Sequence, residues 1–175
     1  MKDNNEEKTL LKATVCIPIR DKKVLFGMKT RKIGVGCWNG FGGGVEDGET
    51  IAECAIRELE EESGLKTRLE DLEKVAIVNF HNEKSDGTIF VSQVHFFLVG
   101  KWEGEPIETK DGAMINLTFF DIDNLPYEKM MPADREFFPL ILKGKKIIVE
   151  SYYTPFQKEL KKSVEIIEVD KLVEE

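Results

Sequence analysis

The apolar and polar positions along the chain predict a series of strands and two helices. Short runs rich in β-branched and aromatic residues, bounded by polar or glycine-containing turns, are typical of strands. Such runs cover residues 9–19, 23–28, 72–80, 89–99, 117–122, 145–150 and 164–169. A helix-like pattern covers residues 51–63 and 133–143. Pro18 lacks an N–H, which favours an edge or bulge position for the end of the first strand.

The first predicted helix has a defined start and stop. Thr50 followed by Glu53 forms a capping box, and Gly64 suits a left-handed C-terminal cap. At 100° per residue, one flank of this helix is mostly small or apolar and is expected to pack on a sheet. Its members are Ala52, Ala55, Ile56, Leu59 and Ser63.

Three glutamates gather on a neighbouring flank of the same helix. Glu58, Glu61 and Glu62 are three or four residues apart, whereas Glu60 points elsewhere. Like charges at this spacing cost a few tenths of a kcal/mol per pair, and acids near a helix C-terminus oppose its dipole. The glutamates are therefore either a solvated acidic face or ligands of a cation. Hard carboxylate oxygens suit Mg²⁺ or Mn²⁺.

The length and composition are those of one globular domain. Residues 9–170 are predicted to form that domain, after a flexible N-terminal stretch over residues 1–8. No apolar run is long enough for a membrane span, and the polar N-terminus does not resemble a signal peptide, so a cytoplasmic protein without membrane contact is expected. Mixed strands with a helix on each side predict an α+β fold, arranged as an α/β/α sandwich.

Charge and cysteine content narrow the function further. A net charge of −8 argues against binding a nucleic-acid polymer, because such binding depends on Lys and Arg. It leaves room for a single nucleotide whose phosphates are bridged by metal. Cys16, Cys37 and Cys54 include no CxxC pair, which argues against a disulfide framework or a zinc site. Whether the protein is a monomer or a homodimer is left open.

Residues 43–65 carry a specific motif. Gly43 is followed after five residues by Glu49, and Glu49 after seven residues by the run REL-EEE-SGL at positions 57–65. This pattern resembles the Nudix box at every fixed position, and it implies the Nudix fold. In that family the loop-helix-loop binds divalent metals that activate water against a diphosphate linkage. The resemblance implies metal binding by Glu58, Glu61, Glu62 and the carbonyl of Gly43.

The same resemblance assigns supporting and catalytic roles. Arg57 and Glu49 are expected to form an ion pair that orients the metal ligands. Glu61 is the expected base that takes the proton of the attacking water. Mg²⁺ is the expected cofactor, with Mn²⁺ as an alternative, and the products are a nucleoside monophosphate and pyrophosphate.

Outside the box, most of residues 9–169 resembles the oxidised purine nucleoside triphosphate hydrolases, the 8-oxo-dGTP diphosphatase branch of the Nudix family. The matching stretches are GMK at 27–29, WNGFGG at 38–43, LPY at 125–127 and FPL at 138–140. The resemblance implies a substrate pocket that binds the base through Asn39 and is lined on its other sides by further residues. Those residues are Thr14, Lys29, Phe80, Met131 and Asp134.

The chain departs from that branch at three places. Met131 stands where a tryptophan covers the purine, and Ala133 replaces the first of two acids, so that only Asp134 remains. Met114 aligns near an expected glutamate, and either Asp111 substitutes for it or the box works alone. Losing one base-reading group relaxes specificity.

Several residues have a simpler interpretation beside the functional one. Asn39 is alternatively a loop cap, Asp134 a helix N-terminal acid, Lys29 a solvated lysine and Phe80 a core residue. Trp38 is taken as a packing residue that positions the loop, with base stacking as the alternative. His81 and His95 are taken as structural or exposed, because no partner acid is evident from spacing.

Two rival functions remain. The first is hydrolysis of another nucleoside diphosphate derivative, such as ADP-ribose or a dinucleoside polyphosphate. The second is a nucleotide sensor without catalysis, although a complete box argues against it.

Overall fold

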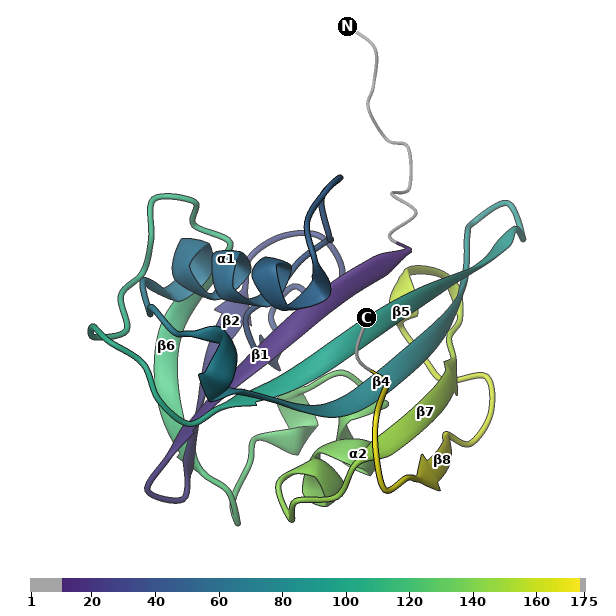
Figure 1. The fold of residues 1–175 in the computed structure, drawn as a ribbon. Coiled ribbons are helices and arrows are strands. Elements are labelled where there is room, and N and C mark those ends of the chain that lie inside the picture. The colour runs from purple at the N-terminus through teal and green to yellow at the C-terminus, as the bar shows by residue number, and fades with distance from the viewer. Residues whose placement is uncertain (1–10, 174–175) are drawn as a thin grey trace, which may run out of the picture.

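A mixed sheet organises the fold in a computed structural model that describes residues 11–173 (Figure 1). The strands are β1 (Lys12–Arg20), β2 (Lys23–Lys29), β3 (Trp38–Asn39), β4 (Leu72–Glu83), β5 (Ile89–Val99), β6 (Met114–Asp121), β7 (Ile147–Tyr152) and β8 (Glu165–Glu168). The helices are α1 (Ile51–Ser63) and α2 (Asp134–Ile141), with the short 3-10 helices η1 (Leu69–Asp71), η2 (Tyr127–Lys129) and η3 (Pro155–Gln157).

The strand order brings segments from distant parts of the chain together. It runs β3-β2-β1-β5-β4-β7-β8, with β6 paired to the other side of β2. The pairs β1–β5 and β4–β7 are parallel, and the remaining pairs are antiparallel. Figure 1 shows β1, β5 and β4 crossing the middle of the molecule, with α1 lying over β1 and β2.

The two faces of the sheet carry separate apolar clusters. On β5, Phe97 and Val99 belong to the cluster beneath α1, whereas Phe96 and Leu98 belong to the cluster that packs against α2. This alternation is the period of two expected of a strand buried on both faces. The arrangement confirms the predicted α/β/α sandwich.

Most predicted elements occur with shifted ends. The strand over 89–99 has the predicted limits, while β4 continues past residue 80 to Glu83 and β6 begins at Met114 instead of 117. The predicted flexible stretch over residues 1–8 and the start of the first strand lie outside the described residues. The segment 151–162, for which no element was predicted, contains η3 and a bridge between Tyr153 and Leu160.

Pro18 is not at a sheet edge, so the edge alternative of that prediction is wrong. β1 is an interior strand, and Pro18 pairs with Val99 of the parallel β5. On its other side, Cys16 is bridged to Phe41 of the glycine loop, and pairing with β2 starts at Ile19. The missing N–H of Pro18 therefore falls between two partners, where no ladder hydrogen bond is required.

The caps of α1 are confirmed, but its buried face is rotated from the prediction. Thr50 and Glu53 form the capping box, and Gly64 has φ 76°. Ala55, Leu59 and Ser63 are buried as predicted, whereas Ala52 and Ile56 are only half-buried. Ile51, Cys54 and Glu62 complete the buried face. The rotation arises because the glycine loop covers the flank that contains Cys54 and Glu62.

The histidines are structural, although His81 does have a partner acid. Its Nε2 lies 2.6 Å from Oε2 of Glu150 on the neighbouring strand β7, and its ring stacks on Tyr152. The pair forms across the sheet, so sequence spacing did not reveal it. His95 is fully buried and its Nε2 is 3.1 Å from Oε1 of Gln93. Trp38 packs edge-to-face on Phe120, as expected of a packing residue.

Candidate active site

A glycine loop runs beside β1 and forms the floor of the site. The Thr14 N–H donates to the Gly43 carbonyl at 2.9 Å, and the Cys16 N–H donates to the Phe41 carbonyl at 2.6 Å. At Gly42 a Cβ atom would overlap the Thr14 carbonyl oxygen. Only glycine allows this approach of two backbones.

Arg57 connects the loop to the acidic face of α1. Its guanidinium makes two hydrogen bonds to Glu49, at 2.6 Å and 3.0 Å, and its Nη1 lies 2.8 Å from Glu58 and 3.2 Å from Glu61. Nη2 also donates to the Gly44 carbonyl. Such bidentate pairing fixes the orientation of the guanidinium. The Arg57–Glu49 pair is thus present as the motif implied.

The three glutamates have unequal environments. The Gly42 N–H donates to Glu62 Oε1 at 3.0 Å, and the Glu58 carboxylate lies against Gly43, where a Cβ atom would be 2.5 Å from Oε1. The Glu62 residue is 7% exposed and the Glu58 side chain 16%, but the Glu61 side chain is 55% exposed. Burial, then the charge of Glu58, raises the pKa of Glu62 to about 7. Burial also raises the pKa of Glu58.

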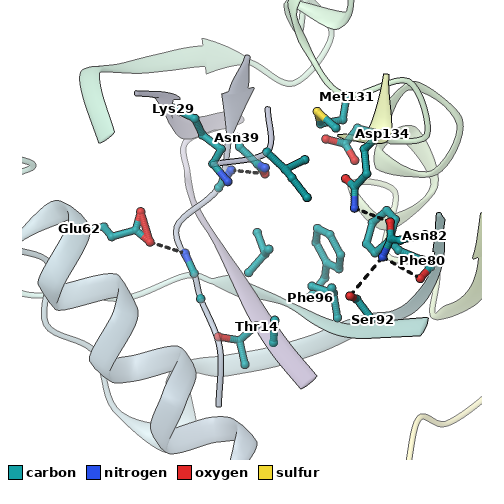
Figure 2. A pocket seen from close by; sticks show the side chains of 18 of the residues that line it. Thr14, Lys29, Asn39, Glu62, Phe80, Asn82, Ser92, Phe96, Met131 and Asp134 are labelled. Atoms are coloured by element: carbon teal, nitrogen blue, oxygen red, sulfur yellow. Dashed lines mark hydrogen bonds between the residues drawn. The ribbon is translucent and has the colours of Figure 1, made fainter. Parts of the chain in front are cut away.

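A single cavity extends from Glu62 across the sheet toward α2 (Figure 2). Figure 2 shows Glu62 on one side of the pocket, and Phe80, Asn82 and Asp134 on the other. All residues that the sequence assigned to substrate binding line this cavity. They are Thr14, Lys29, Asn39, Phe80, Met131 and Asp134.

Asp134 is the most unusual group in the cavity. It is the first residue of α2 and is 3% exposed, and its Oδ2 has no hydrogen-bond partner in the described chain. Burial raises the pKa of Asp134 to about 8. An acid in this state keeps its proton at neutral pH and can both donate and accept a hydrogen bond. An unpaired buried carboxyl beside a cavity indicates a ligand-binding group.

Comparison with known proteins identifies the family. The model of the NUDIX domain matches residues 10–141. The chain belongs to the Nudix family. It is 39% identical over 135 residues to the oxidized purine nucleoside triphosphate hydrolase of Danio rerio, an alignment that spans 77% of this chain and 81% of that protein. The enzyme of the same name from Mus musculus is 38% identical over 133 residues, spanning 76% of this chain and 80% of that protein.

Solved structures agree with this placement. The Mutator MutT protein from Bacillus halodurans superposes with a TM-score of 0.75 at 26% identity, over 90% of this chain and 97% of that one. The Nudix assignment confirms the predicted family and the predicted enzyme class, a hydrolase. No helix among residues 11–173 is long and apolar enough to span a membrane.

The buried carboxylates of this Nudix domain fit a divalent cation, a kind of ion that Nudix hydrolases generally use. No three His, Cys, Asp or Glu side chains within residues 11–173 converge as a finished metal site, because Arg57 and Gly42 hold the glutamates. Yet Glu58 is half-buried and Glu62 is buried, and burial followed by the charge of Glu58 raises the pKa of Glu62. Hard oxygen donors under mutual repulsion suit Mg²⁺ or Mn²⁺.

The carbonyl of Gly43, which is expected to bind a cation, already has a hydrogen-bond partner. The Gly43 carbonyl faces β1 and accepts the Thr14 N–H. In an extended segment the N–H and C=O of one residue point the same way. Since the Gly42 N–H points to Glu62, its carbonyl lies on that side, and it accepts no backbone hydrogen bond from the described part of the chain. Gly42 is therefore favoured over Gly43.

Other predicted residues of the Nudix domain have specific surroundings. The Thr14 hydroxyl lies 3.3 Å from Cys54 Sγ on the α1 side of the sheet. Asn39 Oδ1 accepts the Gly40 N–H at 2.8 Å, so it is a loop cap as well as a cavity residue. Phe80 belongs both to the cavity and to the core. Met114, in place of the expected glutamate, is buried and lines the cavity. Asp111 pairs with Arg31 and is not among the lining residues.

The sequence did not reveal the polar group at the other end of the cavity. Asn82, Ser92 and Gln157 line it beyond Phe80. The predicted strand stopped at residue 80, so Asn82 fell outside it, whereas β4 continues to Glu83. Period-two alternation from Phe80 would have placed Asn82 on the cavity face.

Proposed function

We propose that this Nudix hydrolase converts a purine nucleoside triphosphate, preferably one with an oxidised base, to the nucleoside monophosphate and pyrophosphate, with Mg²⁺ as cofactor. One observation carries the proposal. A continuous cavity joins the buried glutamate Glu62, beside the glycine loop, to the unpaired buried carboxyl of Asp134. The names of the relatives from Danio rerio and Mus musculus support the same substrate class.

The phosphate end would hold the cation through Glu58, Glu62 and the carbonyl of Gly42. A bound divalent ion neutralises phosphate charge and lowers the pKa of a coordinated water. Arg57 keeps Glu58 and Glu49 in place through its hydrogen bonds. Mn²⁺ has the same preference for oxygen ligands.

The reaction is a displacement at phosphorus. The oxygen of water forms a bond to the phosphorus next to the sugar, the P–O bond to the β-phosphate breaks, and pyrophosphate leaves with the electron pair. A carboxylate takes the proton of the water. Glu61 is the candidate for this step, because its exposed side chain is free to turn away from Arg57.

Lys29 lies between the two ends of the substrate. The charges of Glu62 and Asp134 both act on its ammonium group, and burial lowers the pKa of Lys29. Among the residues that line the cavity, it is the one cationic side chain in the described chain. We assign it to the sugar and phosphate side of the nucleotide, where a cation offsets negative charge.

The base end would bind a purine between apolar walls. Phe80 and Met131 supply those walls, and Met131 can cover a base as a soft thioether. Asp134 in its protonated form offers a donor and an acceptor to the edge of the base. Asn39 contributes the amide that the resemblance implies.

Site-directed variants test the phosphate end. Glu58→Gln and Glu62→Gln keep the shape of the side chain but remove its charge, so kcat should fall at least about 10²-fold. Glu60→Gln is the matched control, because Glu60 is on the same helix, is half exposed and pairs with Lys66. Near wild-type turnover in Glu58→Gln or Glu62→Gln, with the fold intact by circular dichroism, would refute the assignment.

A substrate panel tests the base end. Release of pyrophosphate from normal and oxidised purine triphosphates with Mg²⁺ should exceed cleavage of ADP-ribose and dinucleoside polyphosphates. A faster reaction with either of the last two would replace the proposed substrate class. Tight nucleotide binding without any turnover would indicate a sensor.

A further inference from the structure

The far end of the cavity is closed by three polar side chains from separate elements. Gln157 Nε2 donates to Asn82 Oδ1 at 2.7 Å, and Asn82 Nδ2 donates to Ser92 Oγ at 3.2 Å and to the Phe80 carbonyl at 3.1 Å. Asn82 and Ser92 are almost completely buried. Figure 2 shows both on the same side of the pocket as Asp134, away from Glu62. The cluster therefore lies at the base end of the cavity.

Asn82 has no N–H left to donate to a ligand, whereas Gln157 still has one. Both N–H groups of the Asn82 amide are used, and its oxygen accepts from Gln157. A glutamine amide has two N–H donors and a carbonyl acceptor. Gln157 donates one N–H to Asn82 and makes no other side-chain hydrogen bond within residues 11–173. Its carbonyl and second N–H therefore remain available at the cavity wall.

The backbone around Gln157 is held in a conformation that non-glycine residues seldom adopt. Phe156 and Gln157 have φ values of 61° and 53°. The surrounding turn is closed by the Thr154 N–H donating to the Glu159 carbonyl and by the Glu159 N–H donating to the Thr154 hydroxyl. Left-handed backbone at two successive residues costs free energy and persists where the surroundings fix it. The Phe156 side chain is exposed, so the turn places Gln157, not Phe156, against the cavity.

We propose that Gln157 is a specificity-determining residue that binds the oxidised edge of the purine, and that Asn82 positions it. This inference depends on the proposed function. An 8-oxo purine presents an N7–H donor next to the C8 carbonyl, whereas the normal base presents an N7 acceptor next to a C–H. The free carbonyl of Gln157 accepts a hydrogen bond from N7–H of the oxidised base. With the normal base the same carbonyl faces the N7 lone pair, which repels it. Its remaining N–H matches the C8 carbonyl.

The amide of Gln157 would allow the protein to discriminate oxidised from normal purines although Ala133 replaces one of the two acids. Ala133 leaves Asp134 as the single carboxyl at the base end. Buried polar groups left unpaired by the wrong substrate discriminate much more strongly than apolar contacts do. The amide supplies such a group without adding a charge to the cavity.

The decisive experiment compares two substrates in each variant. Gln157→Met has a similar shape and removes both hydrogen-bonding groups. The ratio of kcat/KM for 8-oxo-dGTP to that for dGTP should fall at least about tenfold, mostly through 8-oxo-dGTP. Gln93→Met is the matched control, since Gln93 is on the opposite face of the sheet, bonded to Asn79 and His95. An unchanged ratio in Gln157→Met would overturn the inference.

A purely structural role for Gln157 predicts a different result. A loosened fold lowers kcat/KM for both substrates together, so their ratio stays constant. Asn82→Ala should lower the ratio in the same direction as Gln157→Met, because Gln157 loses its anchor. If Gln157→Met is insoluble, Gln157→Asn, which withdraws the amide by one methylene, must show the loss of preference. 8-bromo-dGTP, which has an N7 acceptor and no N7–H, should respond to each change as dGTP does.

Binding measurements separate this inference from the proposed reaction. If the wild-type enzyme hydrolyses no purine triphosphate, the proposed function fails, and calorimetry with 8-oxo-dGMP and dGMP then decides the role of Gln157. A preference for 8-oxo-dGMP that disappears in Gln157→Met supports base reading. Equal affinities in the wild type would overturn it.

Discussion

At the scale of single residues, burial separates acids that look alike in the sequence. Glu60 and Glu61 are largely exposed and pair with Lys66 and Arg57, whereas Glu62 and Asp134 are withdrawn from water. Burial disfavours the charged form of a carboxyl. The two buried acids are therefore the groups with the most free energy to gain from a ligand, which we propose to be a cation for Glu62 and a base for Asp134.

Asp134 should make the stability of the free protein depend on pH. The pKa of Asp134 is raised from 3.8 to about 8, so the folded state holds a proton that the unfolded state has lost between these values. The free energy of unfolding therefore falls as pH rises through that range, by at most about 1.4 kcal/mol per pH unit. Asp134→Asn should remove the part of the slope that comes from Asp134 and leave the part that comes from Glu62, as measured by urea denaturation at several pH values. Asp123→Asn, at an exposed position, should retain both parts. Parallel pH profiles for wild type and Asp134→Asn would contradict the assignment.

At the scale of elements, helix α1 and the loops at its ends form the most constrained part of the chain. The capping box, the left-handed Gly64 and the glycine loop against β1 each require a particular residue type. These constraints are local, and for that reason the limits of α1 were predictable. Its buried flank was not, because the glycine loop that covers Cys54 and Glu62 packs from outside the helix.

Gly64→Ala should destabilise the domain through two effects. The residue has φ 76°, which costs an alanine about 1–2 kcal/mol, and its Cβ would lie 2.7 Å from Ile107 Cγ1. Gly144→Ala is the matched control, with φ 83° and no neighbour within 4 Å. Thermal denaturation should therefore show a larger loss for Gly64→Ala. Equal losses would mean that the Ile107 contact relaxes without cost.

The strands show what the sequence could and could not predict. Apolar alternation located β4 and β5, because both are long and buried on both faces. It ended β4 at residue 80 instead of Glu83, because the residues after Phe80 are polar, and so it missed one end of the cavity. Gln157 was not predictable from pattern, because its position depends on a left-handed turn without glycine. The six substrate residues came from the family resemblance, and the structure places all of them on one cavity.

At the scale of the whole molecule, the glycine loop ties the sheet to α1. Glu62 on α1 accepts from Gly42, and the neighbouring Gly43 accepts from Thr14 on β1. A cation that draws Glu58 and Glu62 together would relieve their repulsion and add to the free energy of unfolding. Ligand binding to the native state alone stabilises it by mass action.

Mg²⁺ should therefore raise the melting temperature of the wild-type protein. At a concentration ten times the Kd, the gain in unfolding free energy is about 1.4 kcal/mol. Glu62→Gln should abolish this gain, while Glu60→Gln should keep it, and EDTA should reverse it. Melting curves by differential scanning calorimetry provide the measurement. An equal rise in Glu62→Gln would show that the ion binds elsewhere.

The strand order has a consequence for folding during synthesis on the ribosome. β1 leaves the ribosome before β5 but lies in parallel beside it, and the cavity is lined by residues from Ala13 to Gln157. Contacts between segments so distant in sequence slow folding, because long loops must close before these contacts form. We expect the nascent chain to acquire its binding cavity only after β7 and the turn behind it have been synthesised, so a ribosome stalled before that point would display an incomplete enzyme.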